Sequence, residues 1–273
     1  MSRILLHDYR INIKGVKRKT VYHFSDVHLN LTDELSSEEE RQKVSTNASF
    51  WHEGRKSFAK AFGEPYDDEL LIEADEHLES LLNKAREDGD ALIMTGDIFD
   101  YVNEAHVRLF EKKFSNFPIP YVFACGNHEQ AELIPDDCYM SRIKSPVQIL
   151  DLDDLKIIAF DNSNGAVTRE QINALKEQLS QQKPLIIAMH IPIQSENNDI
   201  LKTREEYYRL NNPDCPAENL EFIELIYANT HKIPAVLAGH LHFLNVCELK
   251  PNLTQYVSSQ GLLGNINRYV IGE

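Results

Sequence analysis

The sequence predicts an α/β fold, namely a four-layer α-β-β-α sandwich in which two mixed β-sheets pack face to face with helices outside. Short and almost continuously apolar runs have the pattern of strands that are covered on both faces. Amphipathic helical stretches lie between most of these runs. A second set of runs, separated by turn-like breaks, has the pattern of antiparallel strands. Two packed sheets with outer helices accommodate all these segments.

The predicted elements cover most of the chain. The apolar strands are expected at residues 21–24, 91–94, 121–124, 185–189 and 235–238. The antiparallel set is expected at residues 147–150, 155–160, 245–249, 255–258 and 268–271. Helices are expected at residues 67–87, 102–114, 168–182 and 220–228. In the third helix Ile172, Leu175 and Leu179 recur at helical spacing, and Thr168 with Gln171 fits a capping box.

The length of 273 residues fits one domain with a sizeable core, so we expect a single domain over residues 1–273. Two long and mostly polar segments interrupt the alternation of strands and helices, at about residues 30–65 and 195–216. Long insertions in compact domains are commonly functional loops. We therefore expect these two segments to be loops that cover the functional site.

Composition and charge restrict the possible location and partners. No apolar run approaches the roughly 20 residues that cross a bilayer, and residues 1–20 lack the pattern of a signal peptide. Four widely separated cysteines form no C-x-x-C pair, which favours a reducing cytoplasm over a disulfide framework. The formal net charge is −15, so a nucleic-acid partner is not expected, because polyanions are attracted by basic patches.

Each of the five apolar strands is followed by residues of the types that bind metals. In chain order these residues are Asp26 and His28, Asp97 and Asp100, Asn127 and His128, His190, and His240 and His242. Sites in open α/β sheets form outside the carboxyl ends of the strands, so we expect these side chains in one region. Residues two apart in an extended chain point the same way, so the pairs Asp26–His28 and His240–His242 each present two ligands.

A single histidine after a strand usually has a structural role, whereas five such strand ends together indicate a site. Glycines precede three of the blocks, where a sharp turn or a close backbone approach requires them: Gly96, Gly126 and Gly239. The remaining histidines are interpreted as structural or surface residues: His7, His23, His52, His77, His106 and His231.

The blocks Asp-x-His, Gly-Asp-x-x-Asp, Gly-Asn-His-Glu, a lone His and Gly-His-x-His span Asp26 to His242 and resemble the calcineurin-like metallophosphoesterases. The resemblance implies a double β-sandwich and two transition-metal ions, with Mn, Fe and Zn as candidates. It implies a first metal bound by Asp26, His28, Asp97 and His242. It implies a second metal bound by Asp97, Asn127, His190 and His240, with Asp97 shared by both.

The same resemblance implies hydrolysis of a phosphoester by a hydroxide that bridges the two metals. His128 is then expected to protonate the leaving oxygen, and Asp100 to orient His128 by accepting a hydrogen bond. The expected substrate is a small or nucleotide-like phosphomonoester or phosphodiester. Candidate substrate contacts lie in the two insertions: His52, Arg55, Lys56, Arg204, Tyr207 and Tyr208.

Several departures from related enzymes narrow the substrate class. Protein Ser/Thr phosphatases of this family have Arg where this chain has Tyr101 and Cys125, so the bidentate phosphate contact is missing. Lipid-A-pathway diphosphatases have Arg at the place of His128, and the double-strand-break nucleases usually have His near the place of Asp100. The alternatives that stay open are a metal-dependent nuclease and a non-catalytic scaffold of the same fold. A single structural zinc requires only four ligands and does not account for the larger set.

Overall fold

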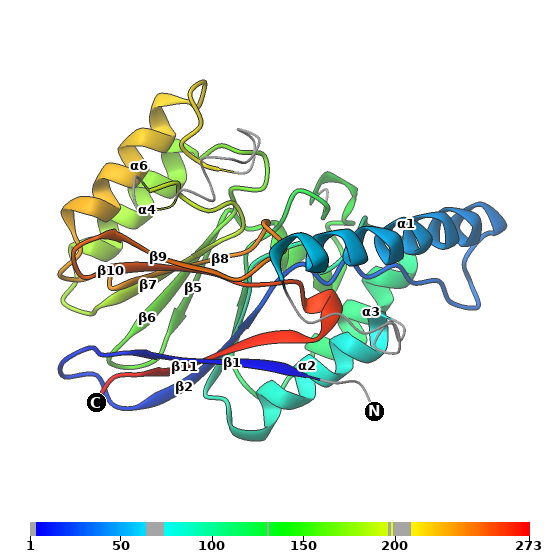
Figure 1. Cartoon of the computed structure of the whole chain (residues 1–273), viewed down its shortest axis with the longest axis horizontal. Helices are drawn as coiled ribbons and strands as arrows, with labels where there is room; N and C mark the ends of the chain where they lie inside the picture. Colours follow the sequence, from blue (N-terminus) through cyan, green and yellow to red (C-terminus); the bar gives the residue numbers. More distant parts are fainter. Residues whose placement is uncertain (1–3, 64–73, 130, 196–197, 199–208) are drawn as a thin grey trace.

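The structure is a computed structural model that describes residues 4–63, 74–129, 131–195, 198 and 209–273, with the side chains of residues 52, 58, 62, 74 and 75 left out (Figure 1). Two mixed sheets form its inner layers. The first has the strand order β1-β11-β2-β3-β4, and the second has the order β5-β6-β7-β8-β10-β9. The predicted four-layer sandwich is confirmed.

The strands of the first sheet are β1 (Leu5–Ile11), β2 (Lys19–Phe24), β3 (Ala91–Met94), β4 (Tyr121–Phe123) and β11 (Asn265–Ile271). The strands of the second sheet are β5 (Val147–Asp151), β6 (Lys156–Phe160), β7 (Leu185–Met189), β8 (Ala235–Ala238), β9 (Asn245–Lys250) and β10 (Leu253–Val257). Each sheet buries one face against the other. Small and branched side chains such as Ile93, Ala188 and Leu237 fill this inner core.

Helices cover the outer faces of both sheets (Figure 1). On the first sheet, α2 (Ala74–Asp88) and α3 (Glu104–Phe114) contribute Leu81 and Phe110 to a core shared with β2 and β3. On the second sheet, α4 (Arg169–Leu179) and α6 (Ala217–Ala228) contribute Leu175 and Phe222 in the same way. The chain also contains short 3₁₀ segments: η2 (Ala131–Leu133), η3 (Tyr139–Lys144) and η5 (Gly261–Leu263).

Three expectations about the elements are corrected. The expected loop at residues 30–65 contains α1 (Glu38–Phe62), a helix of 25 residues that begins with a capping box between Ser37 and Glu40. The strand β1 was not predicted, because its side chains do not form a continuous apolar run. The second set of strands is not simply antiparallel: β6, β10 and β11 each pair with one parallel and one antiparallel neighbour.

The helices agree with the sequence prediction apart from their ends. The helix α4 is capped by Thr168 and Gln171 as expected, and it ends three residues earlier than expected. The expected helix at residues 67–87 is described only from Ala74 onward, because residues 64–73 lie outside the described part. Among the described helices, none combines the length and the apolar composition needed to cross a bilayer.

Candidate metal centre

The five strand ends that carry candidate ligands meet at one edge of the sandwich, although they belong to different sheets. The strands β2, β3 and β4 come from the first sheet, whereas β7 and β8 come from the second. Backbone hydrogen bonds join the loops that follow them. The N–H of Asp26 donates to the carbonyl of Gly96 at 3.0 Å. The N–H of Gly239 donates to the carbonyl of His190 at 3.0 Å.

The structure brings the candidate ligands together in two overlapping groups. Ligand atoms of Asp26, His28, Asp97 and His242 lie within 4.8 Å of one another, and so do those of Asp97, His190 and His240. Asp97 belongs to both groups. The Oδ1 atom of Asn127 lies 3.1 Å from Nε2 of His190, which places this amide beside the second group. All the carboxylate and imidazole groups named here are buried.

The backbone of the ligand residues is not extended, contrary to the sequence-based reasoning. Five residues have a left-handed backbone with φ between 47° and 71°: Asp26, His28, Asp97, His240 and His242. This conformation costs roughly 1–2 kcal/mol per non-glycine residue, so the surroundings have to stabilise it. The intervening Val27 and Leu241 are buried in the core and anchor the two loops. Even so, both residues of the pair Asp26–His28 and both of the pair His240–His242 reach the site.

Two glycines permit the close approach of these loops. A Cβ atom on Gly126 would lie 2.1 Å from Oδ1 of Asp97, and one on Gly239 would lie 1.9 Å from Oγ of Ser25. Neither contact is possible for a real side chain. These two glycines are therefore required by the packing of the ligand loops, as the sequence pattern indicated.

Glu129 organises the two loops that carry Asp97 and Asn127, and its role was not singled out from the sequence. Its buried carboxylate accepts hydrogen bonds from four backbone N–H groups at 2.6–3.1 Å, those of Asp97, Ile98, Phe99 and Gly126. Burial and the nearby charge of Asp97 raise the pKa of Glu129 to about 7. The only available signal was its place in the Gly-Asn-His-Glu block.

The donor set fits a pair of transition metals. Nε2 of His28 lies 3.0 Å from Nε2 of His242, and Nδ1 of His240 lies 3.1 Å from Nε2 of His190, so ring nitrogens converge in both groups. Burial lowers the pKa of His28 to about 4 and that of His240 to about 3, which keeps both imidazoles neutral and able to bind metal. Burial opposes the charged form of His190, yet the carboxylate of Asp97 raises its pKa to about 10. A metal cation bound between His190 and Asp97 would take the place of the proton on the His190 ring.

His128 and Asp100 lie next to each other at the rim of the cluster. Nδ1 of His128 lies 3.0 Å from both the backbone carbonyl and Oδ1 of Asp100. Burial disfavours the charge on His128, but the hydrogen bond to Asp100 outweighs it and raises the pKa of His128 to about 9. The imidazole is therefore held with a proton on Nδ1, which leaves Nε2 for another partner.

Two residues of α1 also contact Asp100, and neither was singled out as a site residue from the sequence. Nε1 of Trp51 donates to Oδ1 of Asp100 at 2.6 Å, and Nδ2 of Asn47 donates to Oδ2 at 2.7 Å. The indole of Trp51 stacks on the imidazole of His28 with ring centroids 3.6 Å apart. These contacts join residues that are far apart in the sequence, so no local pattern reports them.

Of the candidate substrate contacts in the two insertions, only Arg55 and Lys56 have described side chains. Arg55 is buried on α1 and Lys56 is partly exposed there. Arg204, Tyr207, Tyr208 and the side chain of His52 lie outside the described residues.

The structural interpretation of His23 and His106 agrees with their contacts. His23 pairs with Thr95 and Tyr269 inside the core. His106 lies between the N–H of Leu31 and the carbonyl of Tyr101.

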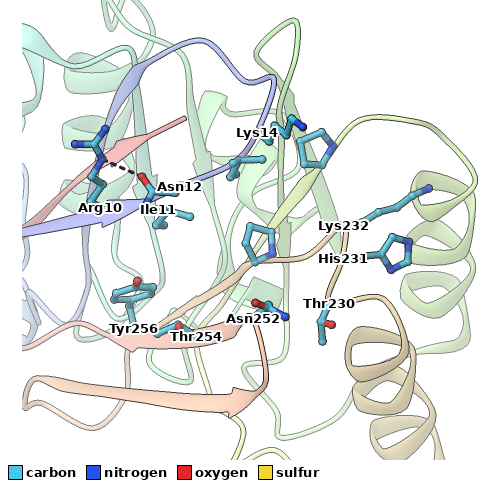
Figure 2. Close-up of a pocket in the computed structure, with 13 residues that line it drawn as sticks. Arg10, Ile11, Asn12, Lys14, Thr230, His231, Lys232, Asn252, Thr254 and Tyr256 are labelled. Atoms are coloured by element: carbon cyan, nitrogen blue, oxygen red, sulfur yellow. Dashed lines mark hydrogen bonds between the residues drawn. The ribbon is translucent and has the colours of Figure 1, made fainter. Parts of the chain in front are cut away.

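A separate cavity of about 450 Å³ lies near the opposite ends of β7 and β8, beside Pro184 and Pro234 (Figure 2). Basic side chains, among them Lys14 and Lys232, line part of it. The ammonium group of Lys232 already donates to the carbonyls of Leu179 and Gln181, both at 2.7 Å. None of the candidate metal ligands lines this cavity.

Comparison with known proteins finds one matching family and several solved structures of similar fold. The family model for the calcineurin-like phosphoesterase matches residues 19–244. No curated protein sequence matches the chain. A dimetal phosphatase from Danio rerio has a similar structure, with a TM-score of 0.54 and 10% identity over 89% of this chain and 88% of that chain. The TT1561 protein of Thermus thermophilus is also similar, with a TM-score of 0.50 and 10% identity over 90% of this chain and 91% of that chain.

Proposed function

This chain belongs to the calcineurin-like phosphoesterase family, and from that membership we propose that it hydrolyses a small phosphomonoester or phosphodiester at the cluster centred on Asp97. The observation that carries the proposal is the position of Asp97 in both groups of metal-binding side chains. A carboxylate shared by two groups suits two neighbouring cations, which is the arrangement used for in-line attack on phosphorus.

We assign Asp26, His28, Asp97 and His242 to one ion, and Asp97, Asn127, His190 and His240 to the other. Mn, Fe and Zn are the candidate metals, because the ligands are mixed oxygen and nitrogen donors. Two ions bound there would supply the positive charge that polarises the phosphoryl group and acidifies the attacking water. The buried position of the ligands supports this assignment, since burial keeps competing solvent away.

His128 is the proposed general acid. Its Nδ1 proton is held by Asp100, and in the metal-free protein this hydrogen bond outweighs burial and raises the pKa of the ring to about 9. With Nδ1 engaged by Asp100, a protonated ring can donate from Nε2 to the leaving oxygen. Asp100 is the proposed positioning partner, because its carboxylate fixes both the tautomer and the orientation of the ring.

The proposed substrate is small or nucleotide-like, and the proposed location is the cytoplasm. Tyr101 and Cys125 are buried and stand where protein phosphatases have Arg, so a large phosphoprotein lacks its bidentate contact. The net charge of −15 disfavours a polyanionic substrate. The wide spacing of the four cysteines supports a reducing compartment.

Metal analysis of the purified chain, combined with a panel of phosphoesters, tests the proposal. We expect about two transition-metal ions per chain and hydrolysis of bis-p-nitrophenyl phosphate. Asp97→Asn is the control, because it removes the charge shared by both groups while preserving shape, and it should lose both metal and activity. A chain that binds metal but hydrolyses none of the phosphoesters would instead support a scaffold.

His128→Ala tests the assignment of the general acid. We expect a loss of roughly 100-fold or more in kcat on a substrate with a poor leaving group, such as an alkyl phosphoester. A p-nitrophenyl ester needs little protonation, so its turnover should change far less. Metal content should stay at the wild-type value. Full activity on the alkyl ester would refute the role of His128.

A further inference from the structure

The helix α1 lies outside both sheets and projects beyond the sandwich (Figure 1). Most of its described side chains are exposed or partly exposed, so packing against a core explains little of its position. Two of its polar side chains contact the site, Asn47 and Trp51, which are four residues apart and therefore share one face of the helix. Both reach the same carboxylate, that of Asp100.

The carboxylate of Asp100 connects α1 to the proposed general acid. Oδ2 accepts from Asn47 at 2.7 Å, and Oδ1 accepts from Trp51 at 2.6 Å while it also faces Nδ1 of His128 at 3.0 Å. Asp100 is buried, so these are hydrogen bonds in a region of low dielectric, where they are stronger than in water. With both oxygens engaged, the carboxylate cannot rotate without breaking a bond to α1.

The indole of Trp51 also covers one side of the cluster. It stacks on His28 with an interplanar angle of 22°, and its centroid lies 5.4 Å from that of His242 and 5.7 Å from that of His128. A single ring thus contacts or approaches three imidazoles of the site.

We propose that Asn47 and Trp51 are positioning residues of the phosphoesterase, which hold Asp100 in the orientation that aligns His128 with the leaving oxygen. This inference rests on the proposed function. It assigns to α1 a part in the reaction itself, in addition to the role of covering the site. The docked position of α1 is then the active one, and loss of either donor lowers acid assistance without removing a metal ligand.

Docking can be measured without activity, because Trp51 is the only tryptophan of the chain. In the metal-free wild type we expect emission typical of a shielded indole and weak quenching by acrylamide. Asn47→Ala should shift the emission to longer wavelength and increase quenching. Ser49→Ala is the matched control, since this exposed residue of the same helix donates to the carbonyl of Ser45. Equal quenching in Asn47→Ala and wild type would overturn the proposed docking.

A double-mutant cycle tests the action through His128. In the metal-loaded enzyme, Trp51→Phe keeps a ring over His28 but removes the donor to Asp100. We expect kcat on an alkyl phosphoester to fall about 10-fold, a fraction of the whole effect of a general acid, while p-nitrophenyl turnover changes less than about twofold. Combined with His128→Ala, the same substitution should have no further effect.

The outcomes separate this inference from the proposed function. An equal loss from Trp51→Phe in both backgrounds, or on both substrates, would show that Trp51 acts only on general stability and would overturn the inference. Absence of bound metal or of any hydrolysis would refute the proposed function. The fluorescence of Trp51 is measured in metal-free protein. It therefore tests the contact of α1 with Asp100 whether or not the protein binds metal or hydrolyses a phosphoester.

Discussion

Glu129 determines how the loops carrying Asp97 and Asn127 sit against each other. A buried carboxylate with two oxygens can accept four hydrogen bonds, and here all four come from backbone N–H groups of these two loops. The loops that carry Asp97 and Asn127 therefore depend on Glu129, which is not itself one of the assigned metal ligands. A loop fixed in this way can keep Asp97 in its left-handed conformation at an acceptable cost.

Glu129→Gln should therefore destabilise the metal-free protein. The amide places an NH₂ group against two backbone N–H groups, and each buried donor left without an acceptor costs about 1–3 kcal/mol. We expect a loss of about 2–4 kcal/mol in the free energy of unfolding, measured by urea denaturation with chelator present. Glu132→Gln, on the exposed side of the same segment, is the control. An unchanged denaturation midpoint for Glu129→Gln would contradict this account.

At the residue scale the sequence predicted which side chains gather at the site but not how the backbone presents them. Strand ends locate Asp26, Asp97 and His240, because apolar runs show where the strands stop. The backbone angles at these positions come from contacts between loops of different strands, such as the bond from the N–H of His240 to the carboxylate of Asp26. Such contacts leave no local pattern in the sequence.

At the element scale, β3, β7 and β8 were predictable because burial on both faces gives a strong apolar pattern, whereas β1 is only partly buried and lacks it. The helix α1 has no such pattern, since much of its surface is exposed. Its capping box at Ser37 and Glu40, with three glutamates in the first turn, was the available signal, and the left-handed Gly63 marks its end. Only the tertiary contacts of Asn47 and Trp51 connect the helix to the candidate site.

Removal of α1 should change substrate preference while sparing the metals. Residues 35–63 would be replaced by a short glycine–serine linker, which leaves Leu31 and Asp33 on their partners His106 and Arg108. We expect wild-type metal content and a shift on the order of 10-fold in the ratio of diester to monoester hydrolysis, because the Trp51 ring next to His28 and His242 is lost. The ratio is measured with bis-p-nitrophenyl and p-nitrophenyl phosphate. An unchanged ratio would exclude α1 from substrate selection.

At the scale of the whole molecule, the segment between β10 and β11 crosses from the second sheet to the first directly behind the site. The N–H of Gly261 donates to the carbonyl of Ser25 at 2.7 Å, and that of Leu262 donates to the carbonyl of Asp26 at 3.1 Å. The two sheets are thus joined through the backbone of a proposed metal ligand. The relative position of the sheets and the geometry of the centre depend on each other.

Gly261→Ala should weaken metal binding without altering any ligand. The added Cβ would lie 2.8 Å from both the carbonyl oxygen of Ser25 and Cγ2 of Val27, so the loop that carries Asp26 has to move. Metal affinity measured by titration calorimetry should fall roughly 10–100-fold, the range seen when the support of a ligand is disturbed. Gly54→Ala, where no heavy atom lies within 4 Å, is the control. Wild-type affinity in Gly261→Ala would show that the loop is supported elsewhere.

The place of β11 has a consequence for how the protein is made. This strand lies between β1 and β2 in the first sheet. The strands β1 and β2, which are synthesised early, are therefore linked in the sheet only by β11, which is synthesised late. On the ribosome, the growing chain has to carry two strands with unsatisfied edges until the last of the described segments has emerged. Folding of the first sheet is therefore a late and long-range event, and chaperone binding during translation is expected to concentrate on β1 and β2.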